Sequence, residues 1–311
     1  MRVIITGGSG HLGSLLAKAF HERHDEVVVV SRNPAPAPWH TIPWEALRYA
    51  VDGSDVVINL AGRSVHCRYG AANRKEIIDS RVLTTRAVGD AIAAAARPPR
   101  VWLQASTATI YAHRYDAAND EVSGIIGGAE PGAPAKWHFS IDVATAWERA
   151  ADEAPAPATR KVKLRTAVVM SRGRDGAFHK YRWLVRHGLG GKHGDGRQWV
   201  SWIHERDFIR VVEWLIDHND VDGTVNVAAP NPLTNADFLR AMREACGVRA
   251  GLPAKKWMLE IGSFLHRTES ELLLKSRRVV PRRLLDAGFR FDFPTWPEAA
   301  RDLCHDGRSE W

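Results

Sequence analysis

The first half of the chain alternates short apolar runs with stretches in which apolar residues recur at helical spacing. The apolar runs predict buried strands at residues 2–6, 26–30, 55–60, 101–105 and 162–170. The helical spacing predicts helices between them at residues 11–23, 44–51, 75–96 and 141–153. Strands that are apolar throughout and alternate with helices are covered on both faces. The pattern therefore predicts an α/β protein with a Rossmann-type, doubly wound parallel sheet.

Two segments interrupt this alternation before it ends near residue 171. Residues 34–43 are rich in proline and predict a loop that replaces a full strand and helix. Residues 121–134 are rich in glycine and proline and predict a loop near the mouth of the site. Helical patterns return at residues 206–217 and 235–246, and the last sixty residues are expected to be mostly helical.

These patterns predict two domains. Residues 1–170 are expected to form the nucleotide-binding domain, and residues 205–230 to return to it. Residues 171–204 and 231–311 are expected to form a smaller, mostly helical substrate lobe.

Composition and charge narrow the class of protein. The 311 residues are 45% hydrophobic and 25% charged, which is typical of a globular chain. The net charge of +7 is scattered, so no nucleic-acid partner is expected. Three widely spaced cysteines without a CxxC motif argue against a disulfide framework and against a metal site. No long apolar run and no signal-peptide pattern is present, so we expect a cytoplasmic protein without membrane contact.

The strongest motif lies between the first predicted strand and the first predicted helix. Its members are Gly7, Gly8, Ser9, Gly10, His11, Leu12 and Gly13. Glycines in this position allow a tight turn, let the backbone approach a pyrophosphate and let the helix pack on the strand. The free N–H groups of the helix N-terminus then face the phosphates. The motif predicts a dinucleotide site.

The end of the second predicted strand favours one nicotinamide cofactor. An acidic residue there would bind the ribose 2′-hydroxyl group, but this chain has Ser31 and Arg32. The Arg32 guanidinium can pair with a 2′-phosphate, and Ser31 can donate a hydrogen bond to it. NADP(H) is therefore the expected cofactor. The alternative is that Arg32 is an ordinary surface arginine.

These motifs, taken in order, resemble the extended short-chain dehydrogenase/reductases. The narrower resemblance is to the atypical epimerase-family branch, described as sugar-nucleotide epimerase-like with a C-terminal domain of unknown function. It extends from Arg2 to about Leu303. Besides the glycine loop, it rests on Asn59-Leu60-Ala61-Gly62, Trp147-Glu148, Gly194-Asp195-Gly196-Arg197-Gln198, Trp202-Ile203-His204 and Arg278-Val279-Val280-Pro281. It implies that Asn59, Leu60, Ala61 and Gly62 line the adenosine side of the cofactor; for Asn59, strand-end capping is an equal alternative.

The resemblance also shows which catalytic residues are missing. The superfamily uses a Tyr and a Lys four residues later, and the lysine lowers the pKa of the tyrosine phenol. Glu148 aligns with the glutamate that follows this lysine by four, which places Ser140 and Ala144 at the Tyr and Lys positions. Neither residue replaces the pair directly. The atypical branch is itself known to lack it.

A hydroxyl motif of the family is retained. Thr107 stands at the catalytic Ser/Thr position, with Ser106 as the alternative if the alignment slips by one residue. Tyr111 is a candidate proton donor, against the alternative of a core aromatic residue. Ser140 completes the candidate catalytic set.

The substrate is expected beyond the sheet. The resemblance places Arg197, Gln198, Trp202 and His204 in a substrate-facing segment that binds the nucleotide part of a sugar nucleotide in extended family members. The alternatives are a core position for Trp202 and a helix-start role for the segment around His204. Relatives commonly form homodimers.

The sequence therefore supports two functions. One is an NADP(H)-dependent oxidoreductase, or epimerase/dehydratase-like enzyme, that acts on a small, perhaps nucleotide-linked substrate through a non-standard site. The other is a catalytically silent protein that binds NADP(H) as a redox sensor or regulator. The intact glycine loop is common to both, and the missing Tyr-Lys pair separates them.

Overall fold

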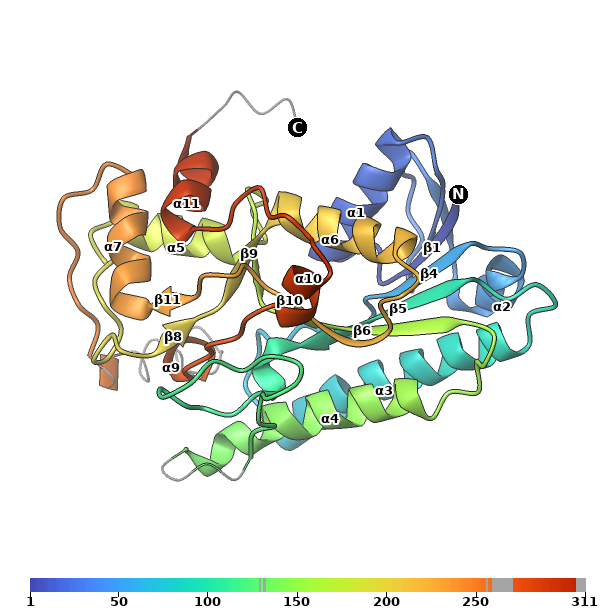
Figure 1. Cartoon of the computed structure of the whole chain (residues 1–311), viewed down its shortest axis with the longest axis horizontal. Helices are drawn as coiled ribbons and strands as arrows, with labels where there is room; N and C mark the ends of the chain where they lie inside the picture. Colours follow the sequence, from blue (N-terminus) through green and yellow to red (C-terminus); the bar gives the residue numbers. More distant parts are fainter. Residues whose placement is uncertain (129, 131–132, 256, 259–270, 306–311) are drawn as a thin grey trace.

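A seven-stranded parallel sheet forms the centre of the computed structural model, which describes residues 1–128, 130, 133–255, 257–258 and 271–305. The strand order is β10-β6-β5-β4-β1-β2-β3 (Figure 1). The strands are β1 (Arg2–Thr6), β2 (Glu26–Val30), β3 (His40–Ile42), β4 (Val56–Asn59), β5 (Val101–Thr107), β6 (Arg160–Thr166) and β10 (Gly223–Val227). The order reverses between β1 and β4. Ligands of doubly wound sheets bind at such a switch point, outside the carboxyl ends of the strands.

Helices cover both faces of this sheet, which confirms the predicted fold class. On one face lie α1 (His11–Glu22) and α6 (Glu205–Asp217), and on the other lie α2 (Leu47–Val51), α3 (Ala71–Ala93) and α4 (His138–Asp152) (Figure 1). Short 3₁₀ turns, η1 (Trp44–Ala46), η2 (Ala108–Ile110) and η3 (Ala135–Trp137), precede or replace helical starts. The apolar strand residues alternate between two separate cores, one under each helical layer.

A second group of helices lies beside the sheet. It comprises α5 (Ala177–Arg186), α7 (Asn235–Ala245) and α11 (Trp296–Cys304), with the short helix α9 (Glu271–Leu274) nearby. The short helix α10 (Arg282–Asp286) instead packs against β10, and its Leu284 belongs to the core of the sheet. Two small ladders pair β7 (Val168–Met170) with β9 (Trp202–His204) and β8 (Trp199–Val200) with β11 (Leu233–Thr234). Phe238 stacks on Trp296 with ring centroids 4.3 Å apart, and together they anchor a core separate from that of the sheet.

The structure corrects three details of the sequence prediction. Residues 34–43 do contain a strand, because β3 pairs with β2 at the sheet edge. The strand expected at residues 162–170 is two strands, since β7 leaves the sheet to pair with β9. The described part of the tail contains short helices separated by extended chain rather than mostly helix. Residues 129, 131–132, 256, 259–270 and 306–311, which belong to the expected loop and lobe, lie outside the described residues.

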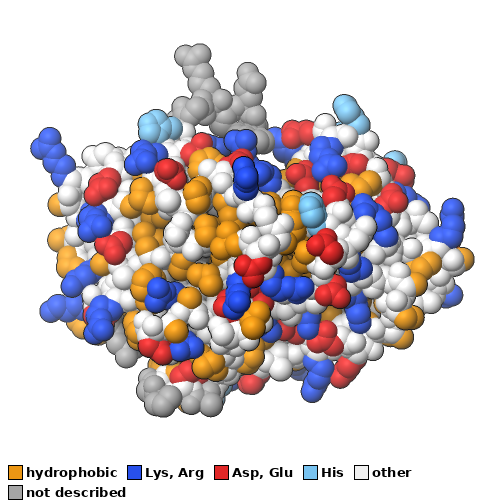
Figure 2. Space-filling model, viewed as in Figure 1, with side chains coloured by type: hydrophobic (Ala, Val, Ile, Leu, Met, Phe, Trp, Pro, Cys, Tyr) orange, Lys and Arg blue, Asp and Glu red, His pale blue; other side chains and the backbone are white. Residues whose placement is uncertain are grey.

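The charge distribution on the surface and the length of the helices are relevant to nucleic-acid and membrane partners. Figure 2 shows Lys and Arg side chains interspersed with Asp and Glu side chains over the visible face. None of the described helices is long and apolar enough to cross a membrane.

Candidate functional site

The glycine loop between β1 and α1 leaves no room for a side chain at Gly7 or Gly13. Gly7 has a φ of +73°, and a Cβ atom there would lie 2.8 Å from the backbone of Ala61. A Cβ atom on Gly13 would lie 2.4 Å from the Cα atom of Gly8. Gly10 begins the helix without a capping side chain, so the first-turn N–H groups are not closed off by one. The loop is therefore a backbone cradle of the kind that fits a pyrophosphate.

His11 closes one side of this cradle. Its Nε2 atom lies 2.6 Å from the Ser171 hydroxyl oxygen, which links the loop to the residue that follows β7. Burial lowers the pKa of His11, and Asp175 partly opposes this shift. The imidazole is therefore biased toward its neutral form at neutral pH and can serve as a hydrogen-bonding group. Leu12 packs against the core beneath, and Ser9 is exposed.

Ser31 and Arg32 differ in how they are held. Ser31 is buried at the end of β2, and its hydroxyl oxygen lies 3.3 Å from that of Ser9. It also accepts a hydrogen bond from the backbone N–H of Asn33. Arg32 is exposed and has no hydrogen-bond or ion-pair partner among the residues that the structure describes. Its guanidinium is therefore available to an anion beside the glycine loop.

Asn59 organises the turn after β4 from within. It is fully buried, and its Oδ1 atom accepts hydrogen bonds from Thr6 Oγ1 at 2.6 Å and from the N–H of Ala61 at 3.1 Å. Its Nδ2 atom donates to Gln104 and Thr85. All of these contacts are internal, so the Asn59 side chain positions the Ala61 backbone beside Gly7. This burial argues against the expected contact of the Asn59 side chain with a cofactor.

The two hydroxyl candidates at the end of β5 are in different environments. Ser106 is buried and donates a 2.6 Å hydrogen bond to Glu148, which also forms a bidentate ion pair with Arg165. Thr107 is half-buried, and its Oγ1 atom accepts a hydrogen bond from the Thr109 N–H at 3.1 Å. No acceptor for the Thr107 hydroxyl proton is found among the described residues. Thr107 is thus the hydroxyl that can reach a ligand.

Charge compensation fixes Glu148 behind Ser106. Burial alone would raise the pKa of Glu148, but hydrogen bonds from Arg165 and Ser106 and the positive charge of Arg165 outweigh it and lower the pKa below its ordinary value. The pKa of Arg165 is correspondingly raised. This pair orients Ser106 and gives the end of β5 a rigid base.

Tyr111 does not fit the role of proton donor. Its side chain is 1% exposed, and its hydroxyl donates a 2.9 Å hydrogen bond to Asn226 Oδ1. Burial raises the pKa of Tyr111, with Arg165 stacked 4.9 Å from the ring centre. The phenol is therefore a structural link between η2 and β10. The burial argues against the expected catalytic role.

The position of the missing tyrosine is linked to the tail of the chain. Ser140 is half-buried in the first turn of α4 and donates a 2.7 Å hydrogen bond to Glu271 Oε2. The Nζ atom of Lys275 lies 3.8 Å from Glu271 Oε1 and donates to the Thr109 carbonyl oxygen at 2.8 Å. Ala144, at the position of the missing lysine, is fully buried. A lysine has therefore reached this region from a different part of the chain.

Sequence reasoning missed Glu271 and Lys275. They lie more than 130 positions beyond Ser140, and no local motif marks them. The titratable side chains near the start of α4, those of Lys136, His138 and Asp142, are all exposed. The only available signal was the charge pair at i, i+4 in an otherwise apolar stretch, which is also common on helix surfaces.

The tail segment that carries Lys275 is joined to the loop after η2. The N–H of Ser276 donates to His113 Nδ1 at 2.8 Å. Further along, Asn119 donates its N–H to Arg278 O, and Val280 returns a 3.0 Å hydrogen bond to Asn119 O. Residues 276–280 are thus held against the loop that follows η2.

The four substrate candidates are not assembled into one surface. Arg197 is exposed, with its guanidinium 5.9 Å from the ring centre of Tyr115. Gln198 is 3% exposed and donates to two backbone carbonyl oxygens, those of His193 and Leu273. Its contacts are therefore internal.

The other two substrate candidates are also buried. Trp202 is fully buried, with its ring centre 5.0 Å from that of Trp296. His204 is 2% exposed; it accepts a hydrogen bond from the Arg206 N–H at the start of α6 and lies 3.0 Å from Asp302. Their burial argues against direct contact with a substrate, and of these four only Arg197 is accessible.

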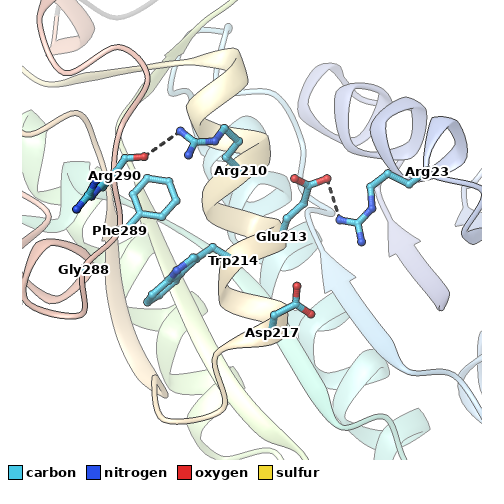
Figure 3. Close-up of a pocket in the computed structure, with 8 residues that line it drawn as sticks. All are labelled: Arg23, Arg210, Glu213, Trp214, Asp217, Gly288, Phe289 and Arg290. Atoms are coloured by element: carbon cyan, nitrogen blue, oxygen red, sulfur yellow. Dashed lines mark hydrogen bonds and ion pairs between the residues drawn. The ribbon is translucent and has the colours of Figure 1, made fainter.

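A hollow of about 360 Å³ lies elsewhere, between the ends of α1 and α6 (Figure 3). Arg23 reaches across it to Glu213 at 3.0 Å, and Arg210 donates to the Arg290 carbonyl oxygen. Its position at the C-terminal ends of these helices is remote from the glycine loop, which precedes α1. It does not coincide with the candidate site.

The geometry describes a doubly wound fold with a glycine cradle at its switch point, and the comparisons agree. Residues 3–228 match the model of the NAD dependent epimerase/dehydratase family, and residues 256–303 match a domain of unknown function, DUF1731. The chain therefore belongs to the NAD dependent epimerase/dehydratase family.

Individual relatives are more specific. The chain is 34% identical over 308 residues to the epimerase family protein SDR39U1 of Bos taurus, covering 97% of this chain and 99% of the relative. The human epimerase family protein SDR39U1 (isoform2), solved with NADPH, is 33% identical with a TM-score of 0.86, covering 98% of this chain and 99% of that chain. A nucleoside-diphosphate sugar epimerase from Corynebacterium glutamicum is 26% identical with a TM-score of 0.75, covering 97% of this chain and 57% of that chain.

Proposed function

We propose that the chain binds NADP(H) in the glycine cradle. The carrying observation is the loop itself, in which a Cβ atom on Gly7 or Gly13 would strike neighbouring backbone. The first-turn N–H groups of α1 would hold the pyrophosphate. Arg32, exposed and unpaired among the described residues, would pair with the 2′-phosphate. The human relative solved with NADPH supports this assignment.

We further propose that the protein is an NADP(H)-dependent oxidoreductase or epimerase-like enzyme. When bound, the cofactor supplies or accepts a hydride. Thr107, whose hydroxyl proton has no described acceptor, would donate a hydrogen bond to a substrate hydroxyl or carbonyl oxygen. Ser106 and Glu148 would keep the end of β5 rigid beneath it. The chemistry is non-standard because Ser140 and Ala144 replace the Tyr-Lys pair.

The substrate is proposed to be a small hydroxyl or carbonyl compound, with nucleotide-linked molecules as the first class to test. The Corynebacterium glutamicum relative, a nucleoside-diphosphate sugar epimerase, supports this choice. The hydroxyl chemistry of Thr107 and Ser140 fits either an alcohol or its carbonyl product.

A second candidate function is NADP(H) binding without turnover, as a redox sensor or regulator. The observation that favours it is Ala144, which is fully buried where the superfamily has a catalytic lysine.

Calorimetry and a turnover assay separate these functions. We expect NADPH to bind more tightly than NADH, and the Thr107→Ala variant to keep that affinity but lose about 100-fold in turnover of carbonyl or nucleotide-sugar substrates. Thr107→Ser is the matched control, because it keeps the hydroxyl and the cap to Thr109. Tight NADPH binding without turnover of any substrate would favour the silent protein, and no binding of either cofactor would contradict both.

A further inference from the structure

The Ser140, Glu271 and Lys275 side chains form a continuous polar chain in an otherwise buried region. Ser140 Oγ donates to Glu271 Oε2 at 2.7 Å, and Lys275 Nζ lies 3.8 Å from Glu271 Oε1. The Glu271 and Lys275 side chains are 3% and 1% exposed. Only Ser140 is half-buried, so it is the end of the chain that a ligand can reach.

The three side chains connect the position of the missing tyrosine to the turn that follows Thr107. Ser140 stands at the position of the missing tyrosine, and Lys275 is bonded to the carbonyl oxygen of Thr109, two residues after Thr107. The Lys275 end of these three side chains therefore lies beside η2, and α4, which carries Ser140, also packs against η2. A buried acid–base pair has a desolvation cost, so its presence at this point calls for an explanation.

Among the polar atoms of these three side chains, Glu271 Oε1 has no hydrogen bond to any residue that the structure describes. It is buried, and the Lys275 ammonium faces it as an ion pair at 3.8 Å. A buried carboxylate oxygen is normally hydrogen-bonded. This oxygen is free to receive a proton from its lysine neighbour or to return one.

We propose that Ser140, Glu271 and Lys275 form a proton relay that replaces the missing Tyr-Lys pair. Ser140 contacts the substrate oxygen, and Glu271 and Lys275 act through it as positioning residues. This inference rests on the proposed oxidoreductase function, and it deepens that function by naming the proton path.

The relay balances in both directions. In alcohol oxidation the substrate O–H bond breaks, its proton passes to Ser140 Oγ, and the Ser140 proton passes along the existing hydrogen bond to Glu271. Glu271 then gives the proton to neutral Lys275, while the hydride from the substrate carbon goes to the oxidised nicotinamide. In carbonyl reduction the same protons move in reverse, starting from the Lys275 ammonium.

The charges around Lys275 fit a group that titrates near working pH. Burial lowers the pKa of Lys275 to about 8, helped by Arg277 and opposed by Glu271 and Glu130. His113 also faces this group across the tail segment, and Lys275 in turn contributes to lowering the pKa of His113. Lys275 can therefore exist in both protonation states in a range where an exposed lysine remains charged.

The pH profile is the decisive activity measurement. With NADPH and diacetyl or phenanthrenequinone as probe carbonyls, we expect kcat of the wild-type protein to fall as the pH rises through about 8, because Lys275 must be protonated. Lys275→Arg keeps the positive charge but cannot release its proton in this range, so we expect kcat to be lower at every pH and its fall near pH 8 to disappear. An unchanged profile in Lys275→Arg would overturn the relay.

Glu271 is tested by a matched pair of variants. Glu271→Gln is isosteric but cannot carry the proton, and we expect roughly a 100-fold loss of kcat with unchanged NADPH affinity. Glu271→Asp, which keeps the carboxylate, should recover part of the rate. Equal activity of Glu271→Gln and the wild-type protein would overturn the relay.

A measurement that needs no enzymatic turnover can test the relay separately from the proposed oxidoreductase function. The chain has ten lysines, so ¹³C-lysine NMR with Lys275→Arg as the assignment control can follow the titration of Lys275. We expect it to titrate near pH 8 and to shift lower in Glu271→Gln, which removes an opposing negative charge. Titration with the other lysines would overturn the relay while NADPH binding stands. A protein that binds no NADPH, or turns over no probe, overturns the proposed function as well.

A different observation carries a second inference, independent of the site. The Sγ atoms of Cys246 and Cys304 lie 2.7 Å apart, although the two residues are 58 positions apart in the chain. Cys246 ends α7 and Cys304 lies at the end of α11, two helices that share the second core. The wide spacing of the cysteines in the sequence had argued against a disulfide framework.

Electrostatics support reactivity at this pair. The hydrogen bond with Cys304 lowers the pKa of Cys246 to about 7, with help from the positive charges of Arg186 and Arg182 on α5. The thiolate is the reactive form of cysteine, and this environment favours it.

We infer that Cys246 and Cys304 form a reversible dithiol site that a peroxide oxidises. Hydrogen peroxide takes two electrons as the two S–H bonds are replaced by one S–S bond, and two water molecules are released. The bond would tie α7 to α11.

Intact mass after peroxide treatment tests this site. We expect the loss of two hydrogens, reversed by a thiol reductant, in the wild-type protein and in Cys67→Ser. Cys246→Ser and Cys304→Ser should each prevent it, and the melting temperature should rise on oxidation in the first two proteins alone. Stable sulfinic acid at Cys246 without a disulfide, or a disulfide to Cys67, would overturn the inference.

Discussion

The cofactor cradle and the region around Ser140 are two neighbouring parts of the molecule built in opposite ways. The cradle consists of backbone, and seven consecutive residues define it. The other region consists of side chains, and it joins α4 and η2 to the tail through the contacts of Ser140 with Glu271 and of Lys275 with Thr109. The first depends on the absence of side chains, whereas the second depends on particular ones.

Because of this difference, we expect cofactor binding to tolerate sequence change better than catalysis does. A backbone cradle needs only glycine and a strand-to-helix turn, so it persists even where the catalytic pair is lost. A side-chain constellation can be rebuilt from another segment, as we propose for Glu271 and Lys275. The predictions below test this contrast, from the largest expected effect to the smallest.

The side-chain region should be the less tolerant of a single polar deletion. Arg165→Met leaves Glu148 buried without its partner, and we expect it to lower the free energy of unfolding by about 3–5 kcal/mol. Lys163→Met on the same strand removes an ion pair whose Asp152 side chain is 58% exposed, and it should cost no more than about 1 kcal/mol. Urea denaturation measures both, and equal losses would contradict the contrast.

The cradle should fail through sterics alone. Gly7 and Gly188 share a φ of +73°, but only at Gly7 would a Cβ atom strike backbone, that of Ala61 and Leu60. Gly7→Ala should weaken NADPH binding by roughly 100-fold, or about 2.7 kcal/mol. Gly188→Ala pays the same backbone strain in open space and should leave binding unchanged. Calorimetry on the folded variants decides, and equal effects would show that strain rather than contact matters.

Arg32 adds specificity to the cradle. Arg32→Ala removes the guanidinium proposed to pair with the 2′-phosphate, and we expect about a tenfold loss of NADPH affinity for this exposed contact. NADH, which lacks that phosphate, is the internal control and should bind as before. A parallel loss for both cofactors would place Arg32 elsewhere in binding.

The smallest expected effect is the loss of stability in acid that results from protonation of Glu148. Its pKa in the folded chain lies below the ordinary value of 4.5, so the ionised pair contributes stability above that pH and loses it as the pH falls through the folded value. The stability difference between the wild-type protein and Glu148→Gln should therefore shrink below pH 4.5. A difference that stays constant under acid would argue against this ionisation.

The sequence was sufficient for whatever is encoded locally. Continuous apolar strands and alternating helices predicted the doubly wound sheet, and the glycine loop predicted its dinucleotide site. Ser140 was placed by counting back from Glu148, which is a local relation too. The predicted roles of Tyr111, Trp202 and His204 rested on residue type, whereas their burial depends on packing that local patterns do not encode.

Contacts between residues that are far apart in the sequence could not be predicted. Lys275 reaches Thr109 only because the tail crosses to the loop after η2, and no periodicity predicts that path. The same holds for Cys246 and Cys304, which are distant in sequence and in contact in the fold.

The crossing of the tail also has a consequence for biosynthesis. Chains fold from the N-terminus while they emerge from the ribosome, so the sheet and the glycine cradle can form early. Glu271 and Lys275 belong to the last eighth or so of the chain, and their partners Ser140 and Thr109 must wait for them. A nascent chain can therefore form its glycine cradle well before the proposed proton path, and a truncated product would carry the former without the latter.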